Sequence, residues 1–159
     1  MMEYFSIQEL DLPADIWNPF AQHYAAAHYD PNQMIYFQES QADCFYYLKK
    51  GRVKTFISSE DGTEKALTVY REGNLFGEAA FFDGMPRVSS AVAITACDIV
   101  RIDRQRATQE IVQNPELALA LMKYLARTVR LLSEHIDNMA FLQTDQRIAR
   151  YLLSLPQSS

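Results

Sequence analysis

The chain has 159 residues and a mass of 18.3 kDa, enough for one domain with a full hydrophobic core, or for one domain plus an appended element. Hydrophobic residues make up 48% of the sequence and charged residues 22%, a composition that favours an ordinary folded globule over disorder. No run of about 18 apolar residues is present, so no membrane span is expected. The first residues lack the basic region and apolar stretch of a signal peptide. We therefore expect a cytoplasmic protein.

Charge is unevenly distributed along the chain. The net charge of −5 argues weakly against nucleic-acid binding by this chain alone. Residues 1–100 hold 7 Lys and Arg against 14 Asp and Glu (−7), whereas residues 101–159 hold 8 against 6 (+2). This difference suggests a partner at the C-terminal end.

The two cysteines, Cys44 and Cys97, both lie in apolar, strand-like segments. Free cysteines of this kind are usually buried, and we expect two buried free thiols. A metal site or an iron–sulfur cluster generally needs more ligands than two distant cysteines supply. The sequence therefore predicts no metal site.

The first 24 residues favour two short helices. Ser6–Glu9 has the Ser-x-x-Glu pattern of a capping box, which marks a helix start. A second helix is predicted from Pro13 to about Tyr24, because its apolar residues recur on one helical face.

Short strands then dominate up to residue 103. Glu60–Thr63 contains the Asp-Gly pair typical of hairpin turns, and Glu72–Asn74 marks another turn. Short strands with turns about every ten residues indicate an antiparallel sandwich or barrel. The predicted strands are Met34–Phe37, Phe45–Gly51, Arg52–Ser58, Ala66–Tyr70, Ser89–Ile94 and Asp98–Asp103.

A long helix is predicted after Asn114-Pro115-Glu116, which offers a cap, a proline at the first helical position and an acid in the first turn. A second helix is predicted to begin at a fresh cap, Thr144-Asp145, and to end at Pro156. The long helix carries a heptad seam, which we expect to pair with a second copy of the chain, packing on its own domain being the alternative. The seam residues, at spacings of 4, 3, 4 and 3, are Leu125, Val129, Leu132, Ile136 and Met139.

Enzyme motifs are absent from the sequence. It has no Gly-x-Ser-x-Gly, no phosphate-loop Gly-Lys-Ser/Thr and no dinucleotide-binding glycine triplet. A metal-dependent cupin enzyme needs clustered His and Glu ligands, whereas His23, His28 and His135 are scattered. We expect no enzyme.

Residues 73–91 carry the most informative pattern. Gly77 permits a ligand to approach backbone N–H groups, and the helical turn that follows would attract an anion. Glu78 can accept hydrogen bonds from a sugar hydroxyl, and Arg87 suits bidentate phosphate recognition. A structural ion pair between Glu78 and Arg87 is the alternative interpretation.

This segment closely resembles the phosphate-binding cassette of cyclic-nucleotide-binding domains. The order of the predicted elements is also similar to that family: helices, an eight-stranded jelly roll (a double-stranded β-helix) with the cassette between two late strands, and a long helix. The resemblance thus implies a mainly β fold with flanking α-helices. The residues that match at the family spacing are Phe76, Gly77, Glu78, Ala79, Ala80, Pro86 and Arg87.

The end of the long helix indicates which branch of that family the chain resembles. Residues 138–153 are similar to the bacterial cyclic-AMP receptor and fumarate–nitrate regulator (CRP/FNR) family, in which the long helix forms the dimer interface and a DNA-binding domain follows. The resemblance implies a jelly-roll domain over 1–113, a dimerisation helix over 114–143, and the start of a winged helix-turn-helix over 144–159. DNA would be bound only through the rest of that domain, which we expect to be absent from this chain.

Two departures from the family pattern bear on the ligand. The resemblance assigns ligand contacts to Phe76, Gly77, Glu78, Ala79 and Arg87. The serine that follows the cassette arginine in the receptor is Val88 here, and Ser89, one position later, should point to the opposite side of its strand. The threonine and serine that contact adenine from the long helix correspond to Leu132 and Ser133, so only the serine is kept.

Two function classes follow from the resemblance. The favoured one is the effector-sensing and dimerisation part of a transcription regulator, with a cyclic nucleotide such as cAMP as effector and no firm cofactor. Haem or a small aromatic acid, the latter held by Arg87, stays open as the ligand of such a sensor. The second class is a cyclic-nucleotide-binding module of another signalling protein, such as a kinase or channel.

Overall fold

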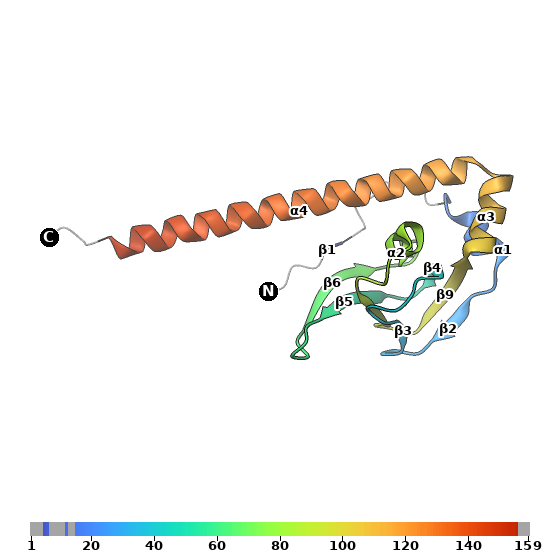
Figure 1. Cartoon of the computed structure of the whole chain (residues 1–159), viewed down its shortest axis with the longest axis horizontal. Helices are drawn as coiled ribbons and strands as arrows, with labels where there is room; N and C mark the ends of the chain where they lie inside the picture. The colour runs from blue at the N-terminus through green and yellow to red at the C-terminus, as the bar shows by residue number, and fades with distance from the viewer. Residues whose placement is uncertain (1–4, 7–11, 13–14, 156–159) are drawn as a thin grey trace.

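The computed structural model describes residues 5–6, 12 and 15–155 and places two β-sheets beside a very long helix (Figure 1). The strands are β1 (Phe5–Ser6), β2 (Ala27–Tyr29), β3 (Met34–Tyr36), β4 (Cys44–Lys50), β5 (Val53–Ser58), β6 (Glu64–Tyr70), β7 (Leu75–Phe76), β8 (Ser90–Ala93) and β9 (Cys97–Asp103). The helices are α1 (Asn18–His23), α2 (Glu78–Asp83), α3 (Arg104–Gln113) and α4 (Glu116–Ser154).

The two sheets form the expected jelly roll. One sheet has the order β1-β6-β5-β8-β3 and the other the order β2-β9-β4-β7. All pairings are antiparallel except that of β1, which runs parallel to β6. The hairpin of β5 and β6 turns at Gly62, whose φ of 86° suits glycine, and the Asp61 side chain accepts a 3.0 Å hydrogen bond from Thr63 N–H. The Asp-Gly signal is thereby confirmed.

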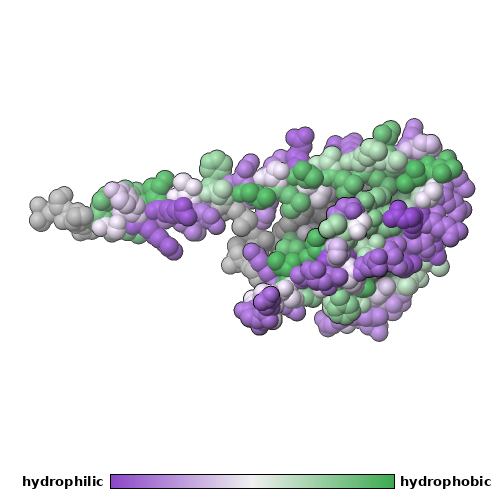
Figure 2. Space-filling view, viewed as in Figure 1, coloured by the Kyte–Doolittle hydropathy of each residue, from purple (hydrophilic) through white to green (hydrophobic). Residues whose placement is uncertain are grey.

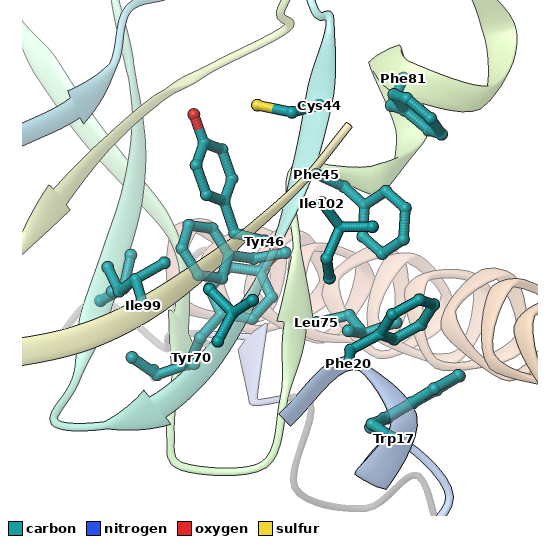
Figure 3. Packing of buried hydrophobic residues seen from close by; sticks show 14 of the residues in the cluster. Trp17, Phe20, Cys44, Phe45, Tyr46, Tyr70, Leu75, Phe81, Ile99 and Ile102 are labelled. Carbon is teal, nitrogen blue, oxygen red and sulfur yellow. The ribbon is translucent and has the colours of Figure 1, made fainter. Parts of the chain in front are cut away.

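The core is largely aromatic and extends from the sheets to α1 and α4 (Figure 3). Phe20 of α1 lies edge-on to Phe45 of β4, with ring centroids 5.6 Å apart, and Trp17 lies edge-on to Tyr124 of α4 at 5.8 Å. Such edge-to-face pairs add to the free energy gained by burial. Cys44 and Cys97 are buried free thiols, as expected.

Several predicted boundaries at the ends of the roll are corrected. Helix α1 begins at Asn18, after a turn over 15–17 in which Asn18 N–H donates to Asp15 O, so the predicted helix starts too early; Pro13 itself lies outside the described residues. Ser6 belongs to β1, and the rest of the predicted Ser6–Glu9 helix lies outside the described residues. Strand β2 and helix α3 were not predicted. The side chain of Asp103 accepts a 2.9 Å hydrogen bond from Arg106 N–H and so caps α3.

Helix α4 is a single helix of 39 residues, so the separate helix predicted from Thr144 is wrong. Thr144 is not a cap: its hydroxyl donates a 3.0 Å hydrogen bond to Ala140 O, one turn back within the helix. Asn114, the residue predicted to cap the start of this helix, accepts a hydrogen bond from Leu117 N–H through its backbone carbonyl. Within the described residues, its side chain makes no capping bond.

The two halves of α4 differ in their contacts. Its first turns bury Leu117, Ala120, Leu121 and Tyr124 against the roll, whereas the second half extends far beyond the sheets (Figure 1). No helix in the described part of the chain is both long and apolar enough to cross a bilayer.

Candidate functional site

A small cavity opens where α2, the end of β6 and the start of β8 meet. Its volume is about 70 Å³. Six of the predicted ligand residues line it, and three further residues complete the wall. The lining residues are Gly77, Glu78, Ala79, Arg87, Val88 and Ser89 from the prediction, together with Tyr36, Tyr70 and Ala80. Phe76 is fully buried behind this wall, where its ring stacks on Tyr46 at 5.1 Å.

Gly77 joins β7 to α2 in a backbone conformation that other residues rarely adopt. Its φ is 71°, and a Cβ atom added there would lie 2.8 Å from Arg87 Nη1 and 3.2 Å from Tyr36 Cε1. Both the turn and the close approach of the arginine therefore require glycine at this position.

Arg87 is buried, with 3% of its surface exposed. Nη1 donates to Gly77 O at 2.5 Å and Nη2 to Cys44 O at 2.6 Å, while the guanidinium carbon lies 4.2 Å from the centre of the Tyr36 ring. The remaining nitrogen, Nε, is buried without a hydrogen-bond partner. Buried donors are nearly always paired, so this unpaired N–H is suited to an acceptor brought by a ligand.

The loop after β3 fixes the backbone of Arg87. Arg87 N–H donates to Ser40 O, and Glu39 N–H donates to Arg87 O, both at 2.8 Å. The backbone of Arg87 is therefore tied to the loop after β3, and its guanidinium to the backbone carbonyls of Gly77 and Cys44.

Glu78, the first residue of α2, is also buried, with 6% exposed. Burial raises its pKa to about 7, and its own backbone N–H and the charge of Arg87 only partly oppose that shift. Glu78 and Arg87 form no ion pair in the described structure, because the guanidinium is bonded to backbone carbonyls. The ion-pair alternative for these two residues is therefore wrong.

Val88 and Ser89 differ in exposure, but both lie in a bend before β8, which begins at Ser90, so the predicted strand alternation is not what separates them. Ser89 is 7% exposed and Val88 is 67% exposed, although both border the cavity. The hydroxyl-bearing side chain is thus on the buried side, and a valine lies at the rim.

Leu132 and Ser133 lie on α4 and do not reach the cavity of the same chain. Leu132 is 44% exposed, and the Ser133 hydroxyl donates a 2.9 Å hydrogen bond to Val129 O. Their predicted ligand contacts stay predictions.

The predicted seam faces solvent along most of its length. Val129 and Ile136 are exposed and Leu125 is half-buried, while the Met139 side chain lies outside the described residues. Figure 2 shows hydrophobic residues interspersed with hydrophilic ones along the projecting part of α4. The alternative, that the seam packs on its own domain, fits Leu125, which packs against the core, but not the exposed Val129 and Ile136.

Tyr36 and Tyr70 are the site residues that sequence reasoning missed. Both are buried, and burial raises the pKa of Tyr36 to about 12 and also raises the pKa of Tyr70 well above its usual value. Their strands, β3 and β6, lie on opposite sides of β5 and β8 in one sheet. No local motif marks either residue.

Comparison with known proteins places this geometry in a family. The model of the cyclic nucleotide-binding domain matches residues 26–114. The cAMP-activated global transcriptional regulator CRP of Salmonella typhimurium is 33% identical over 137 residues, which are 86% of this chain and 65% of that protein. The chain thus aligns with less than two thirds of that relative's length.

Solved structures agree with this assignment. The Thermus thermophilus catabolite activator protein superposes with a TM-score of 0.69 at 24% identity, over 85% of this chain and 63% of that one, and shows the shared fold. The sensor domain of the transcriptional regulator DNR from Pseudomonas aeruginosa has a TM-score of 0.58 at 30% identity, over 82% of this chain and 85% of that one. This chain belongs to the cyclic nucleotide-binding domain family and has the N-terminal domain of a CRP/FNR-type regulator.

Proposed function

We propose that this chain is the effector-sensing and dimerisation part of a CRP/FNR-type transcription regulator, and that its effector is a cyclic nucleotide, with cAMP favoured. The observation that carries the proposal is the unpaired Nε of the buried Arg87, which borders the same cavity as the buried Glu78. One supplies a cation for a phosphodiester, and the other an acceptor for a ribose hydroxyl. The cAMP-activated relatives support this choice of ligand.

The proposed division of roles follows the chain. Residues 1–113 would hold the effector, and residues 114–143 would pair two copies of the chain. Residues 144–159 would begin the DNA-binding domain, and the protein would bind DNA through the rest of that domain. The regulators to which the chain is similar control transcription. We propose the same role here, in the cytoplasm, as a sensor and not an enzyme.

The proposed transmission uses α4, because this helix touches the cassette and also carries the seam. A ligand that binds one packing of α4 more tightly than another shifts the population toward it. The seam residues Leu125, Val129, Leu132, Ile136 and Met139 would relay that shift between the two copies of the dimer.

Calorimetric titration of the full chain with cAMP tests the proposal. We expect binding that Arg87→Leu removes, since a charge-assisted hydrogen bond is worth about 1.5–3 kcal/mol and a bidentate one more. Arg52→Leu is the matched control, because Arg52 is exposed and lies outside the cavity wall. Unchanged binding by the Arg87 variant contradicts the assignment of the cassette.

A carboxylate effector is distinguished by a second variant. Arg87 could also hold a small aromatic acid against the rings of Tyr36 and Tyr46, which lie 4.2 and 5.7 Å from its guanidinium carbon. Glu78→Ala should weaken only ligands that carry a ribose. If this variant binds its effector as tightly as the parent, the sensor recognises an acid and not a nucleotide.

A further inference from the structure

Tyr70 is a buried residue with a hydroxyl group and lies in the wall of the cavity. It is the last residue of β6, is 9% exposed, and packs its ring on Phe76 with centroids 5.5 Å apart. Tyr70 and Glu78 both line the cavity. The cassette motif does not include this residue, since Tyr70 ends β6, seven positions before Gly77.

The Tyr70 hydroxyl stays protonated at neutral pH. The pKa of Tyr70 is raised well above its usual value, first by burial and then by the neighbouring Glu78 and Tyr36. Thr68 and Thr55 oppose part of this rise in the pKa. The Thr55 hydroxyl donates to the Thr68 carbonyl oxygen at 3.5 Å. The protonated phenol of Tyr70 can therefore donate to an acceptor on a ligand.

The cavity wall therefore offers three kinds of polar group. Arg87 supplies a cation with an unpaired N–H, Glu78 an acceptor and Tyr70 a donor. A ligand hydroxyl both donates and accepts hydrogen bonds, so it matches a wall that offers both an acceptor and a donor. In a 3′,5′-cyclic nucleotide, the 2′-hydroxyl is the one sugar hydroxyl left free.

We propose that the Tyr70 hydroxyl is a specificity-determining group of this site, which donates a hydrogen bond to the ligand hydroxyl from which Glu78 accepts one. The inference rests on the proposed function and deepens it, because it commits the site to ribose-containing cyclic nucleotides. A site built to bond a hydroxyl discriminates against an analogue that lacks it, since its polar groups are then left unpaired.

The test compares two ligands, cAMP and 2′-deoxy-cAMP, in calorimetric titrations of the full chain and its Tyr70→Phe variant. We expect the variant to lose about tenfold in affinity for cAMP, the worth of one buried hydrogen bond. Its affinity for 2′-deoxy-cAMP should change less than about twofold, and this binding also shows that the variant is folded. Tyr47→Phe is the matched control, because Tyr47 is half-buried on β4 but lies outside the cavity wall.

The outcomes separate the two proposals. Equal losses for both ligands would show that Tyr70 only supports the fold, and no loss for either would show that its hydroxyl contacts no ligand; each result overturns the inference and leaves the proposed function standing. If the parent chain binds neither nucleotide, the proposed function fails and the role of Tyr70 fails with it.

Discussion

The hydroxyl of Tyr124, on α4, donates a 2.7 Å hydrogen bond to the carbonyl oxygen of Leu75, in β7. Tyr124 is 1% exposed and Leu75 is fully buried, so the bond is shielded from water. Leu75 lies two residues before Gly77, at the entrance to the cassette. This contact joins the helix that carries the seam directly to the backbone that shapes the ligand cavity.

Removal of this hydroxyl should destabilise the chain. Tyr124→Phe leaves the Leu75 carbonyl buried without that partner, which costs about 1–3 kcal/mol in the free energy of unfolding. Urea denaturation followed by circular dichroism measures the loss. Tyr151→Phe, at a position 66% exposed on the same helix, should cost nothing measurable. Equal stability of the two variants would contradict a role for the Tyr124–Leu75 bond.

A matched pair of glycine substitutions tests the close approach at Gly77. Gly77 and Gly84 have nearly the same φ, 71° and 72°, so an alanine at either position carries the same backbone strain, about 1–2 kcal/mol. Only at Gly77 would the new methyl meet another group, Arg87 Nη1 at 2.8 Å, whereas nothing lies within 4 Å at Gly84.

The two variants should therefore differ in ligand affinity more than in stability. Gly77→Ala should displace the guanidinium and lower cAMP affinity at least about tenfold, the worth of one charge-assisted hydrogen bond, and Gly84→Ala should not. Calorimetric titration measures the affinities, and thermal denaturation measures the shared strain. The same affinity in both variants would mean that the guanidinium tolerates the methyl group.

The cassette was predictable because its residues are local. Residues 76–89 form one continuous segment, and the structure brings six predicted residues to one cavity wall. Tyr36 and Tyr70 were not predictable, because their place at that wall depends on the strand order β1-β6-β5-β8-β3, which no local pattern states. Helix α3 has few apolar residues on a regular face, and its cap, Asp103, ends a strand, so the strand signal masked the start of the helix.

The helix boundary predicted at Thr144 fails for a different reason. A threonine hydroxyl can cap the N-terminus of a new helix or bond back to a carbonyl in the helix that contains it, and the residue type is the same in both cases. The seam residues, by contrast, can be named from spacing alone, because a heptad pattern depends on the helix itself and not on its neighbours; their pairing with a second copy stays a prediction.

The buried carboxyl group of Glu78 predicts a pH-dependent stability. Its pKa is raised from 4.5 to about 7 in the folded chain, so between these values the folded state binds more protons than the unfolded state. Stability from this group is therefore present at low pH and lost as the pH rises through about 7, by up to roughly 3 kcal/mol at full ionisation.

Glu78→Gln should remove that dependence. Urea denaturation at pH 5 and pH 8 should show the parent losing stability relative to the variant at the higher pH. Glu116→Gln, at an exposed position in the first turn of α4, should keep the pH profile of the parent. If the parent and Glu78→Gln keep the same difference in stability at both pH values, then Glu78 titrates normally.

The seam on α4 predicts how the chain associates. Ile136 is 64% exposed and lies at the same seam as Val129, which is 63% exposed, so a second copy of the helix can bury both. Ile136→Glu would place two carboxylates near the two-fold axis of that dimer, and burial of an unpaired charge is costly enough to split the dimer or to protonate the acid. Sedimentation equilibrium at pH 8 should therefore show monomers.

Asn138→Glu is the control, because it adds the same charge to an exposed position away from the seam, and it should leave a dimer. A dimer of unaltered strength in the Ile136 variant would show that association uses another surface.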